Sequence, residues 1–452
     1  MGNDASPSGR TPASPPQSPS SAMKFLSPAT QAVHGDDVLN VIDDVAPPIH
    51  LTTTYRYPRD PDLLRPHHER PSYPVLDFGE HCYSRQSTPG LARVEGILTL
   101  LLKQPTVAYS SGLAAFHALL TMLAPKRVAI GAGYHGCHGV LNLYARASGC
   151  QILPLDCNTE ELGPGDLIHL ETPVNPTGLA LNIQHHATKA HSRGAYLSVD
   201  STFAPPPLQE PFALGADVVM HSGTKYLGGH SDFLCGVLAC KNTDWVQRLY
   251  QDRLYLGSVM SGFDSWLLVR SLRTLELRVL RQSQAADYIV RALYQALQQQ
   301  PSDLQTGCGD DSGGSSSSSS ILSADDANVV RGVVKSIQHA SVQPAALESA
   351  SCWLRQQMPR GYGPVFGLTL HSASWARRFP SKLLLFHHAT SLGGVESLIE
   401  WRTMTDATVG RDVLRVSVGV ERKEDLLADL VRGMREVWAE GGGEGVQGRA
   451  KL

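Results

Sequence analysis

Residues 221–230 read His-Ser-Gly-Thr-Lys-Tyr-Leu-Gly-Gly-His, and this stretch decides the expected fold and chemistry. Lys225 follows two hydroxyl residues, Ser222 and Thr224, and precedes a glycine pair. A lysine that holds an aldehyde cofactor as a Schiff base needs close neighbours that bind the cofactor's phosphate, and hydroxyls do this without adding charge. The alternative for so short a pattern is a surface lysine in a turn rich in glycine and serine.

The flanking sequence predicts an α/β fold. Residues 216–220, Ala-Asp-Val-Val-Met, are typical of a buried strand and place Lys225 where that strand ends, the usual position of chemistry in α/β enzymes. Similar short runs alternate with helical patterns, which predicts a mostly parallel sheet with crossover helices. The expected strands are 105–109, 127–130, 151–155, 166–170, 196–200 and 217–220, with a helix over 112–123.

The rest of the chain predicts a second, smaller unit. A long helical stretch over 265–298 closes the large domain. Strands at 363–370 and 414–420 and a final helix over 423–439 then predict an α+β unit.

Two segments have compositions typical of disorder. Residues 1–22 are rich in serine and proline, and residues 301–326 include the serine run Ser315–Ser320, so neither buries enough apolar surface to become ordered. At 452 residues the chain has room for two or three domains of roughly 150 residues each. The predicted division is a tail over 1–22, an N-terminal arm over 23–80, a large cofactor-binding domain over 81–300, an insertion over 301–326 and a C-terminal α+β domain over 327–452.

Composition also argues against several classes of protein. The formal net charge is −3 and no basic stripe is present, so no nucleic-acid partner is expected. No apolar run approaches the length of a membrane span, and no secretory or mitochondrial signal is recognisable, so a cytoplasmic protein is expected. The eight cysteines show no metal-ligand spacing, which predicts buried free thiols and no metal site.

Further residues are suited to a flat, phosphorylated cofactor. Asp200 ends a predicted strand, and a carboxylate there keeps a pyridine nitrogen protonated, which makes the ring an electron sink. Residues 110–114, Ser-Ser-Gly-Leu-Ala, lie between a strand and a helix, where backbone N–H groups bind phosphate. Tyr134 is placed to stack on the ring, Asn175 to bind a ring hydroxyl and Arg415 to clamp a carboxylate. Each of them alone is equally typical of a cap, a turn or the surface.

The order of these motifs resembles the Cys/Met-metabolism family of pyridoxal-phosphate enzymes, the trans-sulfuration group of cystathionine lyases and synthases. The match extends from about His34 to Val431, and the pattern looks closest to that of fungal members. The matching motifs are 46–54, Tyr83-Ser84-Arg85, 110–114, 199–202, 222–232, 391–398 and 415–421. The resemblance implies a large domain of the aminotransferase-like fold type I and pyridoxal 5'-phosphate as cofactor.

The resemblance also implies individual roles. Lys225 would be the Schiff-base lysine and proton shuttle, Asp200 would hold the pyridinium, and Tyr134 would stack on the ring. The remaining cofactor contacts would come from Gly112, Leu113, Asn175, Thr202, Ser222 and Thr224, and the substrate contacts from Ser391 and Arg415.

A shared active site is implied as well. Tyr83 and Arg85 would reach the active site of a neighbouring subunit, with Arg85 at the phosphate and Tyr83 near the substrate. Tyr83 or Tyr134 would then donate or accept a proton. This arrangement predicts a homotetramer made of two catalytic dimers.

Three departures from the family pattern concern the substrate. Thr390 stands where γ-specific members often have Glu, residues 134–137 read Tyr-His-Gly-Cys, and residues 400–406 read Glu-Trp-Arg-Thr-Met-Thr-Asp. The predicted function is a carbon–sulfur lyase that cleaves cystathionine-type amino acids by β- or γ-elimination. The alternatives are a cystathionine γ-synthase or O-acylhomoserine sulfhydrylase and, in another class, a catalytically silent paralogue.

Overall fold

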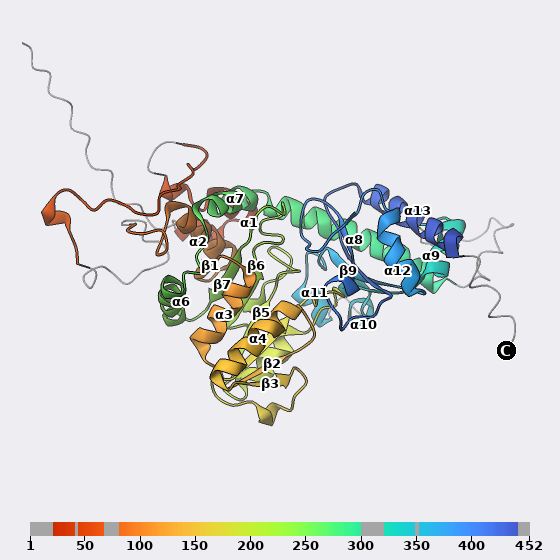
Figure 1. Cartoon of the computed structure of the whole chain (residues 1–452), viewed down its shortest axis with the longest axis horizontal. Coiled ribbons are helices and arrows are strands. Elements are labelled where there is room, and N and C mark those ends of the chain that lie inside the picture. Colours follow the sequence, from red (N-terminus) through yellow and green to blue (C-terminus); the bar gives the residue numbers. More distant parts are fainter. Residues whose placement is uncertain (1–20, 41–43, 67–80, 300–320, 349–351, 442–452) are drawn as a thin grey trace, which may run out of the picture.

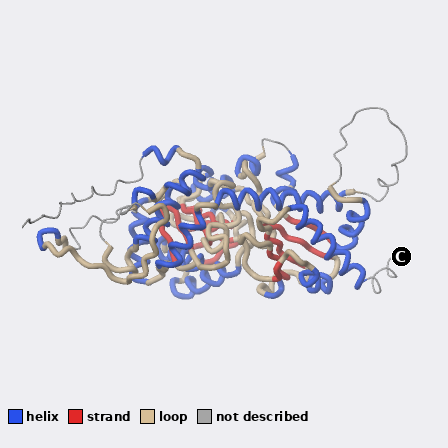
Figure 2. Tube along the Cα trace, turned by 90° about the horizontal axis from the view of Figure 1, so that it is seen from above, coloured by secondary structure: helices blue, strands red, loops and turns tan. Residues whose placement is uncertain are grey.

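The computed structural model describes residues 21–40, 44–66, 81–299, 321–348 and 352–441. Within these residues the strands form two separate sheets with helices around them, and α8 (Leu275–Gln298) extends from the first sheet to the second (Figures 1 and 2). The predicted class, α/β with a mostly parallel large sheet and a smaller α+β unit, is confirmed.

The large sheet has the strand order β1-β7-β6-β5-β4-β2-β3. All neighbouring pairs are parallel except those of β7, which runs antiparallel to β1 and β6 and was not predicted. Because β4, β5 and β6 are parallel and in register, Glu171, Asp200 and Ser222 end neighbouring strands at one edge of the sheet. The strands are β1 (Thr106–Tyr109), β2 (Arg127–Ile130), β3 (Gln151–Pro154), β4 (Leu167–Glu171), β5 (Tyr196–Asp200), β6 (Val218–Ser222) and β7 (Gly236–Cys240).

Alternate side chains of this sheet are buried against two helical layers. Val107 and Tyr109 of β1 pack with α3, α4 and α6, whereas Ala108 packs with α2 and α7 on the other face. Helix α5 covers that second face farther along, over Ile168 and Leu170. The helices are α2 (Pro89–Leu102), α3 (Gly112–Leu123), α4 (His135–Ser148), α5 (Ile183–His191), α6 (Thr243–Leu256) and α7 (Gly262–Leu272).

The small sheet has the order β10-β11-β12-β9-β8, antiparallel except for β10 and β11. Its apolar face packs against α8, α9 and α13. The strands are β8 (Val334–Gln338), β9 (Val365–Leu370), β10 (His387–His388), β11 (Leu398–Trp401) and β12 (Val413–Ser417). The helices are α9 (Ala324–Val333), α10 (Pro344–Glu348), α11 (Trp353–Gln357), α12 (Ala373–Arg378) and α13 (Lys423–Gly441).

The helical stretch predicted over 265–298 is two helices, α7 and α8, separated at Arg273 and Thr274. The break lets the Arg273 side chain leave the helix and donate hydrogen bonds to backbone carbonyls of α1 (Pro28–His34), at Ala32 and Val33. Short 3₁₀ turns complete the fold: η1 (Ser21–Phe25), η2 (Asp37–Leu39), η3 (Pro61–Leu63), η5 (Thr159–Glu161), η6 (Pro211–Leu214), η8 (Ala340–Val342), η9 (Phe379–Lys382) and η10 (Arg402–Met404).

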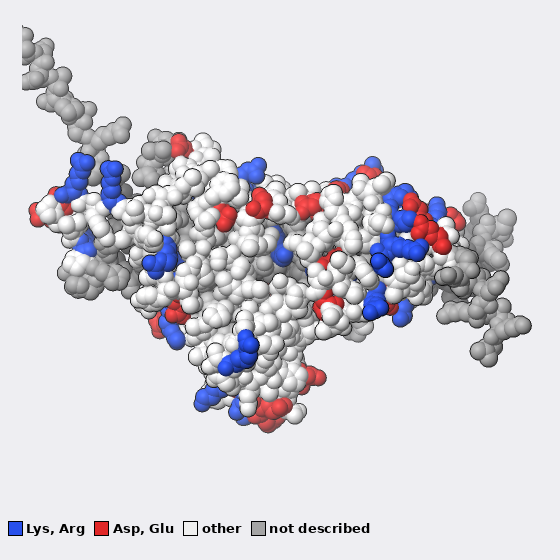
Figure 3. Space-filling view, in the orientation of Figure 1, with Lys and Arg blue, Asp and Glu red and all other residues white. Residues whose placement is uncertain are grey.

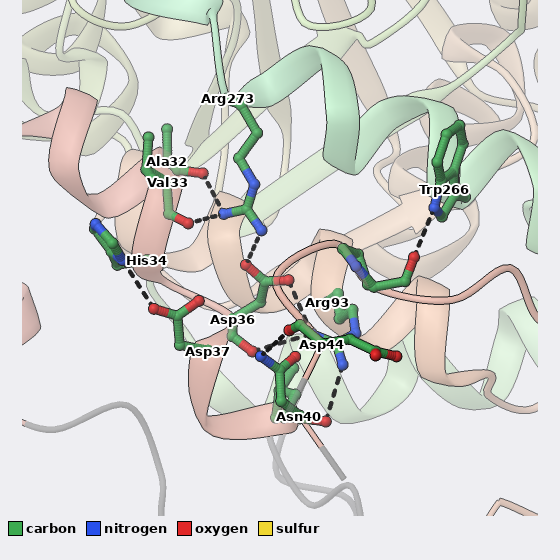
Figure 4. Close-up of polar contacts among 12 residues, drawn as sticks. Ala32, Val33, His34, Asp36, Asp37, Asn40, Asp44, Arg93, Trp266 and Arg273 are labelled. Carbon is green, nitrogen blue, oxygen red and sulfur yellow. Dashed lines mark hydrogen bonds and ion pairs between the residues drawn. The ribbon is translucent and has the colours of Figure 1, made fainter. Parts of the chain in front are cut away.

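The N-terminal arm is attached to the large domain by a buried ion-pair network (Figure 4). The Asp36 carboxylate accepts hydrogen bonds from Arg93 Nη1 at 3.0 Å and from Arg273 Nη2 at 2.6 Å. Farther along, Trp266 Nε1 donates to the Pro47 carbonyl at 2.8 Å. One buried carboxylate between two guanidinium groups therefore holds the arm against α2 and α7.

Charged side chains on the face in Figure 3 are of both signs, and they gather most densely over α9, α12 and α13. Arg435 pairs with Asp325 and Asp326, each at 2.8 Å. These charges neutralise one another instead of forming a surface of one sign. None of the helices in the described part of the chain is long and apolar enough to cross a bilayer.

The predicted domain limits stay predictions, since the two segments that were predicted to be disordered fall mostly outside the described residues. Residues 1–20 and 300–320 are not described, but η1 already occupies 21–22 and α9 already begins at Ala324. Of the described cysteines, Cys137, Cys150, Cys157, Cys235 and Cys240 are buried free thiols as expected. Cys82 and Cys352 are only partly buried, so the prediction was wrong for these two.

Candidate active site

Lys225 lies in the turn that follows β6 and points into a cavity between the two sheets. Its Nζ donates a hydrogen bond to Ser391 Oγ at 2.8 Å. Burial, aided by the nearby Arg415 guanidinium, lowers the pKa of Lys225 to about 8. The amine is therefore deprotonated more readily than an exposed lysine, as a nucleophile or general base requires. This placement favours the functional interpretation of residues 221–230 over a surface turn.

Asp200 ends β5 and is buried at the bottom of the cavity. Its Oδ1 accepts hydrogen bonds from the Thr202 N–H at 3.0 Å and the Thr202 hydroxyl at 2.5 Å. Thr202 Oγ1 in turn accepts the Ser222 N–H at 2.8 Å. Burial raises the pKa of Asp200, while both hydrogen bonds from Thr202 oppose this shift. Thr202 thus fixes the orientation of the Asp200 carboxylate.

The N-terminus of α3 lies beside Ser222 and forms a phosphate-sized cradle. Ser111 caps the helix, its Oγ accepting the Ala114 N–H at 3.1 Å. A Cβ atom added to Gly112 would lie 3.1 Å from Ser222 Cβ, so glycine allows the close approach of α3 to Ser222. Ser111, Gly112, Leu113, Ser222 and Thr224 all line the cavity. Their N–H groups and the helix dipole suit an anion.

Thr224 differs from its neighbours in the cradle. Its Oγ1 accepts the Cys235 N–H at 2.9 Å and donates to the Cys235 carbonyl at 3.3 Å. The hydroxyl therefore secures the turn to the residue before β7, although Thr224 also lines the cavity. Its predicted contact with phosphate stays a prediction.

Glu171 organises the two loops that carry Tyr134 and Asn175. Its carboxylate accepts the Tyr134 N–H at 2.7 Å and the Asn175 N–H at 2.6 Å. Burial, together with Asp200, raises the pKa of Glu171 to about 8. Tyr134 lines the cavity and is 40% exposed, and its stacking on the cofactor ring stays a prediction. The sequence analysis assigned no role to Glu171.

Arg415 of β12 is the charge at the small-sheet side of the cavity. Its Nη1 donates to Asn175 Oδ1 at 3.1 Å, and its Nη2 donates to the Ser391 carbonyl at 2.7 Å. Asn175 and Ser391 therefore hold the guanidinium at the cavity from either side. The structure brings these three predicted residues to the same side of Lys225.

Two residues without a predicted role complete this side. Glu400, opposite Arg415 across β11 and β12, lies 2.6 Å from Arg415 Nη2 and 2.8 Å from Arg402 Nη1. Both guanidinium groups and the carboxylate are buried, and Arg402 lines the cavity with Thr390 and Thr405. The departures noted in the sequence are therefore concentrated at the substrate end. Their pairing was not predictable from spacing, since it depends on strand register.

The turn that presents Ser391 requires unusual backbone angles. Ser391 has φ +77° and Gly393 has φ +83°. A Cβ atom at Gly393 would come within 2.8 Å of Tyr226 N and 2.9 Å of Lys225 C. Glycine therefore lets this turn contact the Lys225 backbone, which sets the Ser391–Lys225 hydrogen bond.

Tyr83 and Arg85 are not among the residues that line the cavity of this chain. Tyr83 is 45% exposed, and Arg85 Nη1 donates to the Leu254 carbonyl at 2.8 Å. Their predicted role in a neighbouring subunit stays a prediction.

The cavity fits a phosphorylated pyridine cofactor. Its volume is about 490 Å³, within the range of small-molecule sites. The anion cradle, the Lys225 amine and the Asp200 carboxylate all line this one space. Among the described residues no hydrogen bond reaches Asp200 Oδ2, which leaves an acceptor for a ring N–H.

Known proteins resemble this chain over most of its length. A family model described as Cys/Met metabolism PLP-dependent enzyme matches residues 29–302 and 333–435. The cystathionine gamma-lyase of Saccharomyces cerevisiae is 30% identical over 431 residues, which cover 90% of this chain and 97% of that protein. The cystathionine gamma-synthase of Escherichia coli is 31% identical over 424 residues, which cover 86% and 93%. The crystal structure of an apo methionine gamma lyase from Micromonospora echinospora matches with a TM-score of 0.71 at 30% identity, over 90% of this chain and 99% of that one.

Proposed function

The chain belongs to the Cys/Met metabolism family of PLP-dependent enzymes, and from this premise we propose that it is a carbon–sulfur lyase acting on cystathionine-type amino acids. As a family member it is a trans-sulfuration enzyme that uses pyridoxal 5'-phosphate. The reaction proposed is β- or γ-elimination. The observation that carries the proposal is the single cavity that Lys225, Asp200 and Arg415 all line.

Each residue has a defined task in this mechanism. Bound pyridoxal phosphate supplies an electron-accepting ring that stabilises negative charge at the substrate Cα. The Lys225 Nζ, with its lowered pKa, removes the Cα proton, and the resulting ammonium supplies a proton to the sulfur as the carbon–sulfur bond breaks. Asp200, oriented by Thr202, keeps the ring nitrogen protonated. Arg415 binds the substrate α-carboxylate between Asn175 and the Ser391 carbonyl, which orients the Cα–H bond toward the lysine.

The position of Arg402 favours cystathionine as the substrate over an amino acid with an uncharged side chain. Its side chain is buried at the cavity, and among the described residues its Nε has no hydrogen-bond partner. Cystathionine carries a second carboxylate at the far end of its side chain, whereas methionine ends in a methyl group. A second guanidinium at the substrate end suits that distal carboxylate.

We also propose that the active site is shared between subunits of a cytoplasmic homotetramer. Tyr83 and Arg85 lie near the end of α6 and outside the cavity of their own chain. Their partly exposed side chains are available to complete the site of another copy.

Product identification tests the function. The purified protein, loaded with cofactor, is incubated with L-cystathionine. Pyruvate, ammonia and homocysteine identify β-elimination, whereas 2-oxobutyrate, ammonia and cysteine identify γ-elimination. Absence of both sets contradicts the lyase proposal. The protein is then assayed with O-acylhomoserines and a thiol for γ-replacement.

A further inference from the structure

Three buried side chains lie close together at one end of the cavity, and the proposed reaction uses only one of them. They are Cys137 of α4, His169 of β4 and Asp200 at the end of β5. Each offers one ligand atom, and the three atoms lie within 4.8 Å of one another. They come from positions far apart in the sequence, which is why no metal-ligand spacing was visible there.

His169 is oriented for coordination. Its Nδ1 lies 2.7 Å from Ser198 Oγ, while its Nε2 is buried and has no hydrogen-bond partner among the described residues. The ring also packs against Phe116, with the centroids 4.4 Å apart. Ser198 acts as the outer hydrogen-bond partner that metal-binding histidines usually have.

The cluster adjoins a small void and contains no lysine or arginine. Among the ion pairs of the described residues, none includes the Asp200 or the Glu171 carboxylate. A void of about 10 Å³, the size of about one water, touches Cys137, His169 and Glu171, whereas Asp200 lines the larger cavity.

A thiolate, an imidazole and a carboxylate form a typical ligand set for Zn²⁺. Tetrahedral zinc has bonds of about 2.0–2.3 Å, which place ligand atoms roughly 3.3–3.7 Å apart. The three atoms lie within 4.8 Å of one another and would need to approach by up to about 1.5 Å to bind zinc. Three protein ligands leave the fourth coordination position for water.

We propose that the chain without cofactor binds one Zn²⁺ through Cys137, His169 Nε2 and Asp200, and that zinc and pyridoxal phosphate exclude each other. Exclusion follows because both use the Asp200 carboxylate. This part rests on the proposed placement of the cofactor ring nitrogen at Asp200. The metal site itself does not depend on which reaction the enzyme catalyses.

Cobalt titration of the full-length apoprotein tests the site. The cofactor is removed with hydroxylamine and any affinity tag is cleaved, and Co²⁺ is added as a spectroscopic probe of thiolate ligation. The expected result is a thiolate-to-cobalt absorption band that saturates at one equivalent and disappears when Zn²⁺ is added. Absence of the band overturns the proposal.

Variants identify the ligands. Cys137→Ala and His169→Gln should each weaken Zn²⁺ binding by more than about 100-fold, since even outer partners of a metal site are worth 10- to 100-fold. Cys240→Ala is the matched control, because Cys240 is a buried free thiol of β7 outside the cluster. Circular dichroism checks that each variant is folded. Unchanged binding in a folded Cys137→Ala protein overturns the proposal.

Competition tests exclusion separately from catalysis. Pyridoxal phosphate added to the zinc-loaded protein should release the metal, measured in the protein fraction after dialysis. A holoprotein that retains zinc at this site as tightly as the apoprotein contradicts exclusion. Lyase activity of the metal-free holoprotein is measured in parallel. Absence of this activity would count against the proposed function without affecting the result of the metal titration.

Discussion

The large sheet and the small sheet each form one wall of the same cavity, and buried carboxylates have different partners on the two walls. On the large-sheet wall, Asp200 and Glu171 lie on neighbouring strands, and no ion pair among the described residues includes them. Hydrogen bonds from backbone N–H groups and from Thr202 satisfy them instead. On the small-sheet wall, Glu400 lies between Arg415 and Arg402.

The difference separates chemistry from recognition. Burial without a cation raises the pKa values of Asp200 and Glu171, so this wall can respond to the charge of a bound ring. Burial alone would raise the pKa of Glu400, but Arg415, Thr405 and Arg402 outweigh that effect and lower it. Glu400 on the small-sheet wall therefore stays ionised. The large-sheet wall is suited to proton transfer and to stabilising charge on the cofactor ring. The small-sheet wall is suited to binding a substrate carboxylate in a fixed position.

The largest effect is expected for Lys225→Ala. Removing the amine removes both the nucleophile and the proton carrier, so turnover should fall by more than about 10⁴-fold. Lys241→Ala, at an exposed lysine outside the cavity, is the control. Steady-state kinetics with cystathionine measure both variants. Full activity in Lys225→Ala would show that the large-sheet wall does not carry the chemistry.

Asp36→Ala tests how much a buried carboxylate between two guanidinium groups contributes to stability at a place outside the cavity. Like Glu400, it lies between two guanidinium groups, those of Arg93 and Arg273. Asp36→Ala leaves both without their partner, and breaking such a buried pair costs about 3–5 kcal/mol of unfolding free energy. Asp37→Ala, in an exposed pair with His34, is the control and should cost about 1 kcal/mol or less. Denaturant unfolding measures both, and equal losses would contradict the account.

Glu400→Gln tests the small-sheet wall directly. Losing one partner of a buried charge pair costs about 2–5 kcal/mol, and we expect part of it as a KM at least about tenfold higher. The value of kcat and the cofactor absorbance should change little, because Glu400 positions Arg415 without touching the reacting atoms. Glu400→Asp should recover part of the loss. A fall in kcat with KM unchanged would assign Glu400 to the chemistry instead.

Arg402→Met tests whether the small-sheet wall selects the substrate. We expect kcat/KM for cystathionine to fall by about tenfold, the lower range for loss of a charge-assisted hydrogen bond, while kcat/KM for methionine changes less. Competition kinetics with both substrates measure the ratio. An equal fall for both would show that Arg402 only supports Glu400.

The smallest effect concerns the pH dependence of the large-sheet wall. The pKa of Glu171 is raised to about 8 in the folded protein, so the stability that its protonated form contributes is lost as the pH rises through that value. Glu171→Gln cannot titrate, and its amide accepts only one of the two backbone N–H groups that the carboxylate accepts, so the informative quantity is how its Tm difference from the wild type changes with pH. The apo variant should gain in Tm relative to the wild type as the pH rises from about 4.5 to about 8, and the difference should level off above that. A constant difference would show that Glu171 is already ionised at neutral pH.

The sequence predicted the large-sheet wall better than the small-sheet wall. Lys225, Asp200 and the residues before α3 belong to short local motifs next to strands, and the structure places them together. Glu400 and Arg415 meet through antiparallel register across β11 and β12, and β11 carried no recognisable strand signal. Cys137, His169 and Asp200 meet only when α4, β4 and β5 are packed, so their proximity is not visible in the sequence.

Borohydride reduction of the holoprotein followed by peptide mass mapping tests whether Lys225 holds the cofactor. Reduction makes the bond between the cofactor and its lysine permanent, so the labelled peptide identifies the residue. We expect one pyridoxyl group per chain, on Lys225. A label on another lysine, with Lys225 unmodified, would contradict the assignment of this cavity as the active site.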